Sequence, residues 1–118
     1  MTLSELLQRQ WQGYAKVHRS RMNLMIHIVS VPVFIVGMLA LFAALINLST
    51  IGVVSSVVAV TLAFGLQGLG HAKEAVAAEP FTGPAQAIVR ILLEQFITFP
   101  RFVFSGAWYL AFKHATNP

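Results

Sequence analysis

The stretch that decides the fold runs from Met22 to Ala72 and reads MNLMIHIVSVPVFIVGMLALFAALINLSTIGVVSSVVAVTLAFGLQGLGHA. These 51 residues contain no Asp, Glu, Lys or Arg. One membrane-crossing helix needs roughly 20 predominantly apolar residues, so the stretch is long enough for two. A short polar turn at residues 47–50 divides it, which predicts an antiparallel hairpin of helices over residues 23–47 and 51–70.

The overall composition agrees with an integral membrane protein. Hydrophobic residues make up 57% of the chain and charged residues only 10%, whereas a soluble domain carries about 25% charged residues. The length of 118 residues fits a single membrane domain over residues 1–118. The absence of cysteine excludes disulfides and thiolate metal sites. The net charge of +4 is scattered singly, so we expect membrane lipid rather than nucleic acid as a partner.

The basic residues predict the orientation of the hairpin. Four basic residues precede it and others follow it, whereas the connecting turn carries no charge; they include Arg9, Lys16, Arg19 and Arg21 before it and Lys73 and Arg90 after it. By the positive-inside rule, both ends of the hairpin are cytoplasmic. The membrane would be the inner membrane in a bacterium and the endoplasmic reticulum in a eukaryote.

The segments on either side of the hairpin also read as helices, which makes the predicted fold all-α. Residues 2–19 form an amphipathic helix, because Thr2 and Glu5 have the spacing of a capping box and the apolar side chains share one face. Residues 85–112 contain two apolar runs separated at Pro100. They predict two interfacial helices or a re-entrant pair of helices, and the remaining alternative is one kinked membrane span. The sequence leaves the oligomeric state open, and a homo-oligomer is compatible with it.

Two histidines mark the cytoplasmic ends of the predicted hairpin helices. His27 lies near the start of the first helix and His71 at the end of the second, so they should lie at similar depth. Small and polar residues, which line contacts between membrane helices, form a stripe on each helix that ends at its histidine. Because ionisable residues inside a membrane segment are uncommon and usually functional, the pair predicts a site.

A metal site is the chemistry that these residues favour. Glu74 follows His71 by three residues, which places both side chains on one helix face. Two histidines with one carboxylate are the ligand set of many non-haem Fe(II) oxygenases. His18 is a candidate third histidine, provided that the helix breaks near residues 20–23, because a continuous helix would place His18 and His27 about 180° apart. Arg19 and Arg21 are candidates to bind a fatty-acid carboxylate at the membrane surface.

The spacing of these residues resembles a known family. The motifs H-R-x3-N-x3-H and G-H-x2-E-x5-P, with their flanking residues, resemble the fungal-type 2-hydroxy fatty acid dioxygenases; the matching positions are Tyr14, His18, Arg19, Asn23, His27, Pro32, Gly70, His71, Glu74, Pro80 and Pro84. The resemblance implies a membrane enzyme that uses Fe(II) and O₂ to shorten 2-hydroxy fatty acids by one carbon in α-oxidation. It also implies that His18, His27 and His71 bind the iron.

The first hypothesis is therefore an Fe(II)-dependent dioxygenase, with His18, His27, His71 and Glu74 as metal-binding and catalytic residues. Fatty acid and O₂ would be its substrates. Two other functions remain open. Two histidines on facing helices could bind haem as axial ligands, or the histidines could stabilise a non-catalytic membrane protein through polar contacts between helices.

Overall fold

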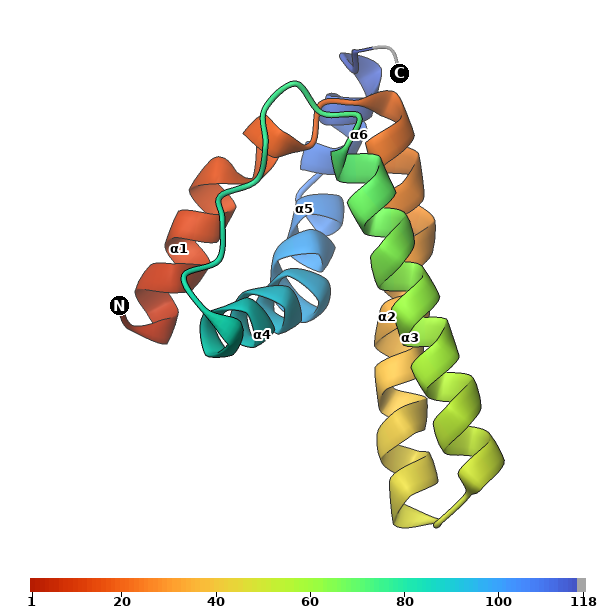
Figure 1. The fold of residues 1–118 in the computed structure, drawn as a ribbon. Coiled ribbons are helices and arrows are strands. Elements are labelled where there is room, and N and C mark those ends of the chain that lie inside the picture. Colours follow the sequence, from red (N-terminus) through yellow and green to blue (C-terminus); the bar gives the residue numbers. More distant parts are fainter. Residues whose placement is uncertain (117–118) are drawn as a thin grey trace.

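The computed structural model describes residues 1–116 of the chain, and every regular element in that range is a helix. The elements follow in the order α1 (Leu3–Tyr14), η1 (Ala15–Val17), α2 (Arg21–Ile46), α3 (Thr50–His71), α4 (Pro84–Leu93), η2 (Glu94–Thr98), α5 (Phe99–Phe104) and α6 (Ala107–Lys113) (Figure 1). The all-α prediction is confirmed.

The N-terminal helix begins at the predicted cap. The Thr2 side chain accepts a hydrogen bond of 3.1 Å from the backbone N–H of Glu5, which satisfies one of the free donors of the first turn. Helix α1 ends at Tyr14, and the 3₁₀ turn η1 continues the chain as far as Val17. His18 then leaves the helical conformation, with φ −134° and ψ 61°. The break that a shared metal site requires is therefore present, but it lies at residues 18–20, slightly before the expected residues 20–23, because Ser20 already caps α2.

Helices α2 and α3 form the predicted hairpin. Ser20 caps the start of α2 and Ser49 caps the start of α3, each accepting a backbone N–H three residues ahead. The helices touch closely at Gly37, where an added Cβ would lie 2.9 Å from the Val60 side chain. Both helices are long and apolar enough to cross a membrane, by length and composition. Protein covers only 28% of the apolar window of α2 and 17% of that of α3, unlike the mostly buried core helix of a soluble protein.

The C-terminal part differs from the prediction in where its helices divide. Pro100 does not interrupt the helix; α4, η2 and α5 follow one another without a break from Pro84 to Phe104. One π-helical turn precedes the proline, with the Phe99 N–H bonded to the carbonyl of Glu94, and such turns let a helix absorb irregular hydrogen bonding. The division comes instead at Gly106, whose φ of 86° is left-handed and suits glycine.

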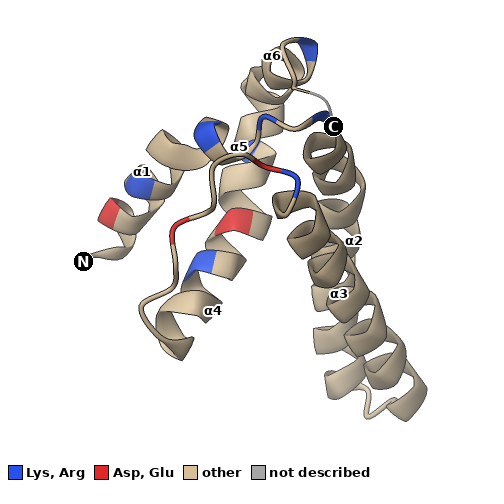
Figure 2. Ribbon diagram, turned by 45° about the horizontal axis from the view of Figure 1, so that its top comes forward, with Lys and Arg blue, Asp and Glu red and all other residues tan. Residues whose placement is uncertain are grey.

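The helices pack around one end of the hairpin (Figure 1). Helix α6 lies beside the start of α2, while α1 and α4 stand to one side of the hairpin, connected to it through α5 and the segment after α3; the turn end of the hairpin extends away alone. Figure 2 shows that Lys, Arg and Glu lie in the rest of the structure and that the extended end carries none. A buried apolar core of Tyr14, Leu24, Val31, Phe99 and Phe102 joins α1, α2 and α5. This packing fixes the ends of the hairpin helices that carry histidines.

Candidate metal centre

Three histidines and one glutamate meet where four elements converge. His18 follows η1, His27 lies in α2, His71 ends α3, and Glu94 begins η2. One ligand atom from each residue lies within 4.8 Å of the corresponding atoms of the others. Ligand distances of about 2.0–2.2 Å around a single ion hold ligand atoms within roughly 4 Å of one another. The four side chains are therefore close to the spacing that one metal ion requires.

The orientation of two histidine rings is fixed by backbone carbonyls. The Nδ1 atoms of His18 and His27 lie 2.8 Å from the carbonyl oxygen of Tyr14 and 3.0 Å from that of Asn23. A carbonyl only accepts hydrogen bonds, so each Nδ1 carries the proton and each Nε2 keeps its lone pair. Both Nε2 atoms are buried without a hydrogen-bond partner, and each lies 3.7 Å from Oε2 of Glu94.

Unpaired buried polar atoms are costly and rare in folded proteins. Two of them, the Nε2 atoms of His18 and His27, lie beside the same carboxylate oxygen of Glu94. Nδ1 of His71 is a third buried nitrogen without a hydrogen-bond partner. A cation between the rings and Glu94 would satisfy the two Nε2 atoms and balance the carboxylate charge. The donor set and its unpaired atoms therefore fit a bound metal ion.

Tyr14 supports two members of the cluster. Its hydroxyl donates a 2.8 Å hydrogen bond to Oε2 of Glu94. Its ring stacks on the ring of His18 with centroids 3.8 Å apart and an interplanar angle of 17°. Metal-binding side chains are commonly oriented by such outer contacts. Tyr14 thus positions His18 and Glu94 relative to each other.

The buried surroundings set the charge states of these groups. Burial lowers the pKa of His18 well below its usual value, and the neighbouring His27 and His71 lower it further. His18 is therefore neutral at physiological pH and available as a ligand. Burial raises the pKa of Glu94, against the opposing effects of the Tyr14 hydrogen bond and Arg90. A cation beside Glu94 would offset the cost of keeping that carboxylate ionised.

The structure does not bring Glu74 into this cluster. Its carboxylate accepts hydrogen bonds from the backbone N–H groups of Arg19 and Ser20 at 2.9–3.1 Å, and from the Asn23 side chain at 2.7 Å. The physical reason is that α3 ends at His71, so Glu74 no longer shares a helix face with it. Glu74 instead fastens the segment after α3 to the break before α2.

Glycine allows α2 and α3 to meet at the level of the histidines. A Cβ at Gly70 would overlap the side-chain oxygen of Asn23 and lie 3.2 Å from its Cγ. The Asn23 side chain occupies that space because its amide nitrogen bonds to Glu74 and to the carbonyl of Val17. Gly70 thus sits beside the network that aligns His71 with the start of α2.

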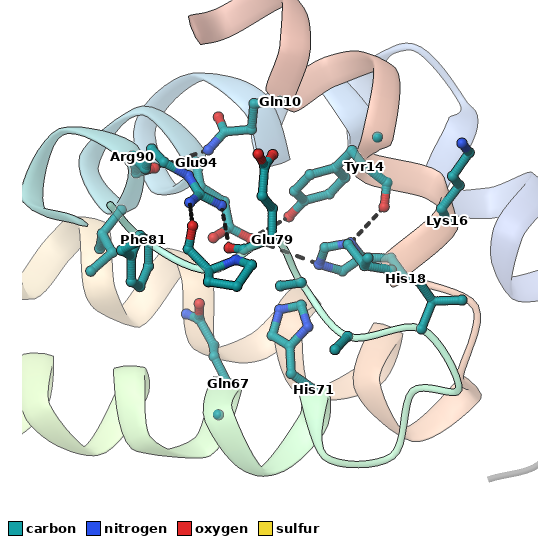
Figure 3. A pocket seen from close by; sticks show the side chains of 18 of the residues that line it. Gln10, Tyr14, Lys16, His18, Gln67, His71, Glu79, Phe81, Arg90 and Glu94 are labelled. Atoms are coloured by element: carbon teal, nitrogen blue, oxygen red, sulfur yellow. Dashed lines mark hydrogen bonds and ion pairs between the residues drawn. The ribbon is translucent and has the colours of Figure 1, made fainter. Parts of the chain in front are cut away.

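A cavity of about 540 Å³ opens onto the cluster (Figure 3). His18, His71 and Glu94 line it, whereas His27 does not. Its walls come from α1, α3, α4 and the segment that follows α3. The predicted carboxylate-binding residues Arg19 and Arg21 are not part of this wall. The basic side chains that line it are Arg9, Lys16 and Arg90.

A buried polar contact fixes the position of Glu94 relative to α3. The side-chain amides of Gln67 in α3 and Gln95 in η2 exchange two hydrogen bonds, of 2.9 and 2.6 Å. Gln67 precedes His71 by one helical turn, and Gln95 adjoins Glu94. The pair therefore ties the π-helical turn that carries Glu94 to the helix that carries His71.

Sequence reasoning missed Glu94 as a member of the site. Its spacing of four residues from Arg90 allows an ion pair along one helix, which is a sufficient reason for a glutamate at that position. The overlooked signal is that Glu94 is the only acidic residue after Glu79, within a segment that is otherwise largely apolar. A lone carboxylate on such a helix requires a partner.

Comparison with known proteins identifies a matching protein family. The sequence model of the family described as 2-hydroxy-palmitic acid dioxygenase Mpo1-like matches residues 4–112. No curated protein and no solved structure matches the chain. The matched range contains all four residues of the cluster.

Proposed function

The chain belongs to the 2-hydroxy-palmitic acid dioxygenase Mpo1-like family, and from this premise we propose that it is a membrane-embedded, non-haem Fe(II) dioxygenase. It would shorten 2-hydroxy fatty acids by one carbon. The observation that carries the proposal is the convergence of His18, His27, His71 and Glu94, with two Nε2 lone pairs unpaired and facing one carboxylate.

The ligand set supports iron. Imidazole and carboxylate ligands suit Fe(II), and protein ligands that occupy only part of its coordination sphere leave positions for substrate and O₂. Bound Fe(II) would supply the electrons that activate O₂ and a Lewis acid for the substrate oxygens. We propose Glu94 as the carboxylate ligand in place of Glu74, because the Glu74 carboxylate is bonded to the backbone N–H groups of Arg19 and Ser20 and to the Asn23 side chain.

The remaining residues prepare this site. Carbonyls of Tyr14 and Asn23 hold the two imidazoles in the tautomer that presents Nε2. The Tyr14 hydroxyl, whose pKa is raised well above 10 by burial and by Glu94, stays protonated and directs its proton to that carboxylate. The rings of His18 and His27 are almost fully buried, which excludes water from one side of the centre.

The membrane placement is part of the same proposal. Helices α2 and α3 would cross the bilayer with both ends on the cytoplasmic side, because the charged residues gather at that end (Figure 2). The cavity and the histidine cluster lie at the same end of the hairpin. A fatty acid resident in the membrane would therefore have its polar head near the cluster and its acyl chain toward the lipid.

The geometry disfavours the haem alternative. The rings of His18, His27 and His71 contact one another edge to face, with centroids 4.8–5.0 Å apart. This packing leaves no space for a porphyrin between any two of them. A purely structural role also fits poorly, since polar contacts between membrane helices stabilise through paired groups, and here Nε2 of His18 and His27 are unpaired.

The test is anaerobic purification of the full chain in detergent, followed by iron quantification and a turnover assay with 2-hydroxyhexadecanoic acid. We expect about one iron per chain, O₂ consumption, and a product one carbon shorter. His27→Ala and His71→Ala should lose both iron and turnover, whereas His114→Ala, which changes an exposed histidine outside the cluster, should retain both. A colourless iron-free protein that still turns over would overturn the proposal.

A further inference from the structure

We propose that Gly68 is a specificity-determining residue, and that the face of α3 from His71 to Phe64 is the bed on which the acyl chain of the substrate lies. This inference rests on the proposed function and adds to it the position of the substrate chain. It follows from the shape of the cavity and from which side chains are small along it.

The cavity follows one face of α3. Phe64, Gln67, Gly68 and His71 all line it, and their spacing of three and four residues places them on a single face of the helix. At about 1.5 Å per residue, the distance along the axis from His71 to Phe64 is roughly 10 Å. The cavity therefore extends from the metal centre for about two helical turns toward the uncharged part of the hairpin.

The wall opposite α3 combines apolar side chains with charged side chains that are already paired: Arg9 binds Glu79, and Arg90 binds the backbone carbonyls of Glu79 and Pro80. Ile91 lines the cavity from α4, and Val76, Ala77, Ala78 and Phe81 line it from the segment after α3. In Figure 3, His18 and Tyr14 stand on one side of the cavity, and Arg90 and Phe81 stand on the other. A ligand with a polar head and an apolar chain matches this distribution, with its head at the cluster.

Gly68 keeps the bed open where it leaves the metal centre. It lies one helical turn before His71, and a Cβ added at Gly68 would meet no other atom within 4 Å. The neighbouring lining residue Gln67 has its side-chain amide bonded to that of Gln95. A larger side chain at position 68 would therefore project into the cavity without displacing protein atoms.

The same helix offers a matched control. Gly65 also has no atom within 4 Å of an added Cβ, but it does not line the cavity. Replacing either glycine with leucine raises helix propensity, so neither substitution should prevent folding. Only the substitution at Gly68 should reduce the space available to an acyl chain.

The experiment compares Gly68→Leu, Gly68→Ala and Gly65→Leu with the unchanged protein. Iron content and the kcat/KM values for 2-hydroxyhexadecanoic acid and for short 2-hydroxybutanoic acid are measured on each. We expect Gly68→Leu to lower kcat/KM for the long acid by at least about tenfold, with a smaller loss in Gly68→Ala. The short acid, the iron content and Gly65→Leu should be unaffected.

A second readout separates this inference from the proposed function. Binding of non-hydroxylated hexadecanoic acid is measured by titration calorimetry and needs no turnover. Weaker binding in Gly68→Leu than in Gly65→Leu supports the acyl bed even if the unchanged protein proves inactive. Equal binding in the two variants overturns it, and so does an equal loss of activity toward long and short acids, which would place the effect at the metal centre.

Discussion

The Tyr14 hydroxyl donates a hydrogen bond of 2.8 Å to Oε2 of Glu94, and that oxygen also lies 3.7 Å from the Nε2 atoms of His18 and His27. A residue from the N-terminal helix thus orients a carboxylate from the C-terminal helices toward histidines that border the hairpin. The contact links three parts of the chain at the candidate metal centre.

Removing this hydroxyl should weaken metal binding without unfolding the protein. Tyr14→Phe keeps the ring that stacks on His18 but leaves Glu94 without its donor. Outer contacts of this kind typically contribute 10- to 100-fold to metal affinity or activity, and we expect a loss of about that size. Iron affinity measured by competition with a chelator checks it. Tyr109→Phe, at an exposed tyrosine, is the control and should match the unchanged protein.

The two glutamates should respond differently to the same substitution. Glu94→Gln replaces a carboxylate ligand with a neutral amide, so iron content should fall sharply. Glu74→Gln should retain iron and lower thermal stability, because hydrogen bonds to a charged acceptor contribute about 1.5–3 kcal/mol each. Metal analysis and a melting curve on each variant decide between the two carboxylates. Loss of iron from Glu74→Gln with full retention by Glu94→Gln would reverse the assignment.

Much of the fold could be predicted because its signals are local. Each signal is read from residues that are contiguous in the sequence. They are the charge-free run from Met22 to Ala72, the polar turn at residues 47–50 and the cap at Thr2. The proximity of His27 to His71 also followed, since a hairpin with a short turn brings its two open ends together. The need for a break after His18 followed from helix geometry alone.

The fourth member of the cluster could not be predicted in the same way. Glu94 reaches the histidines because a π-helical turn and the Gln67–Gln95 pair set the position of a separate helix against α3. No short-range pattern specifies that packing. Glu74 was the natural choice by spacing, but the end of α3 at His71 redirects its side chain to the backbone of Arg19 and Ser20.

Acid should destabilise the metal-free protein through His18. Its pKa in the folded state is lowered by burial, so below about pH 6.5 the unfolded chain binds a proton that the folded one does not. The neutral His18 therefore makes its full contribution to the free energy of unfolding above that pH. The contribution falls by up to about 1.4 kcal/mol per pH unit as the pH decreases toward the pKa of His18 in the folded state. Glu94, whose pKa is raised, acts in the opposite direction because acid neutralises a buried carboxylate.

The contribution of His18 is isolated by difference. Melting curves of the chelator-treated protein and of His18→Gln are compared between pH 7.5 and pH 5. We expect the melting temperature to fall less steeply with acidification in His18→Gln, because the substituted side chain does not titrate. Identical slopes in the two proteins would mean that the folded state protonates His18 as readily as the unfolded chain does.

Position 70 should require glycine because any larger side chain would overlap the Asn23 side chain, and a double-mutant cycle tests this expectation. Gly70→Ala places a Cβ against the Asn23 side chain, and overpacking at a buried contact costs about 1–3 kcal/mol. Gly65→Ala, at a position with free space, should leave stability unchanged or slightly raised. In the background Asn23→Ala, most of the cost of Gly70→Ala should disappear, because the overlapping atoms are gone and contacting residues couple. Additive losses in the double variant would instead mean that Gly70 is required for its backbone and not for the space that it leaves to Asn23.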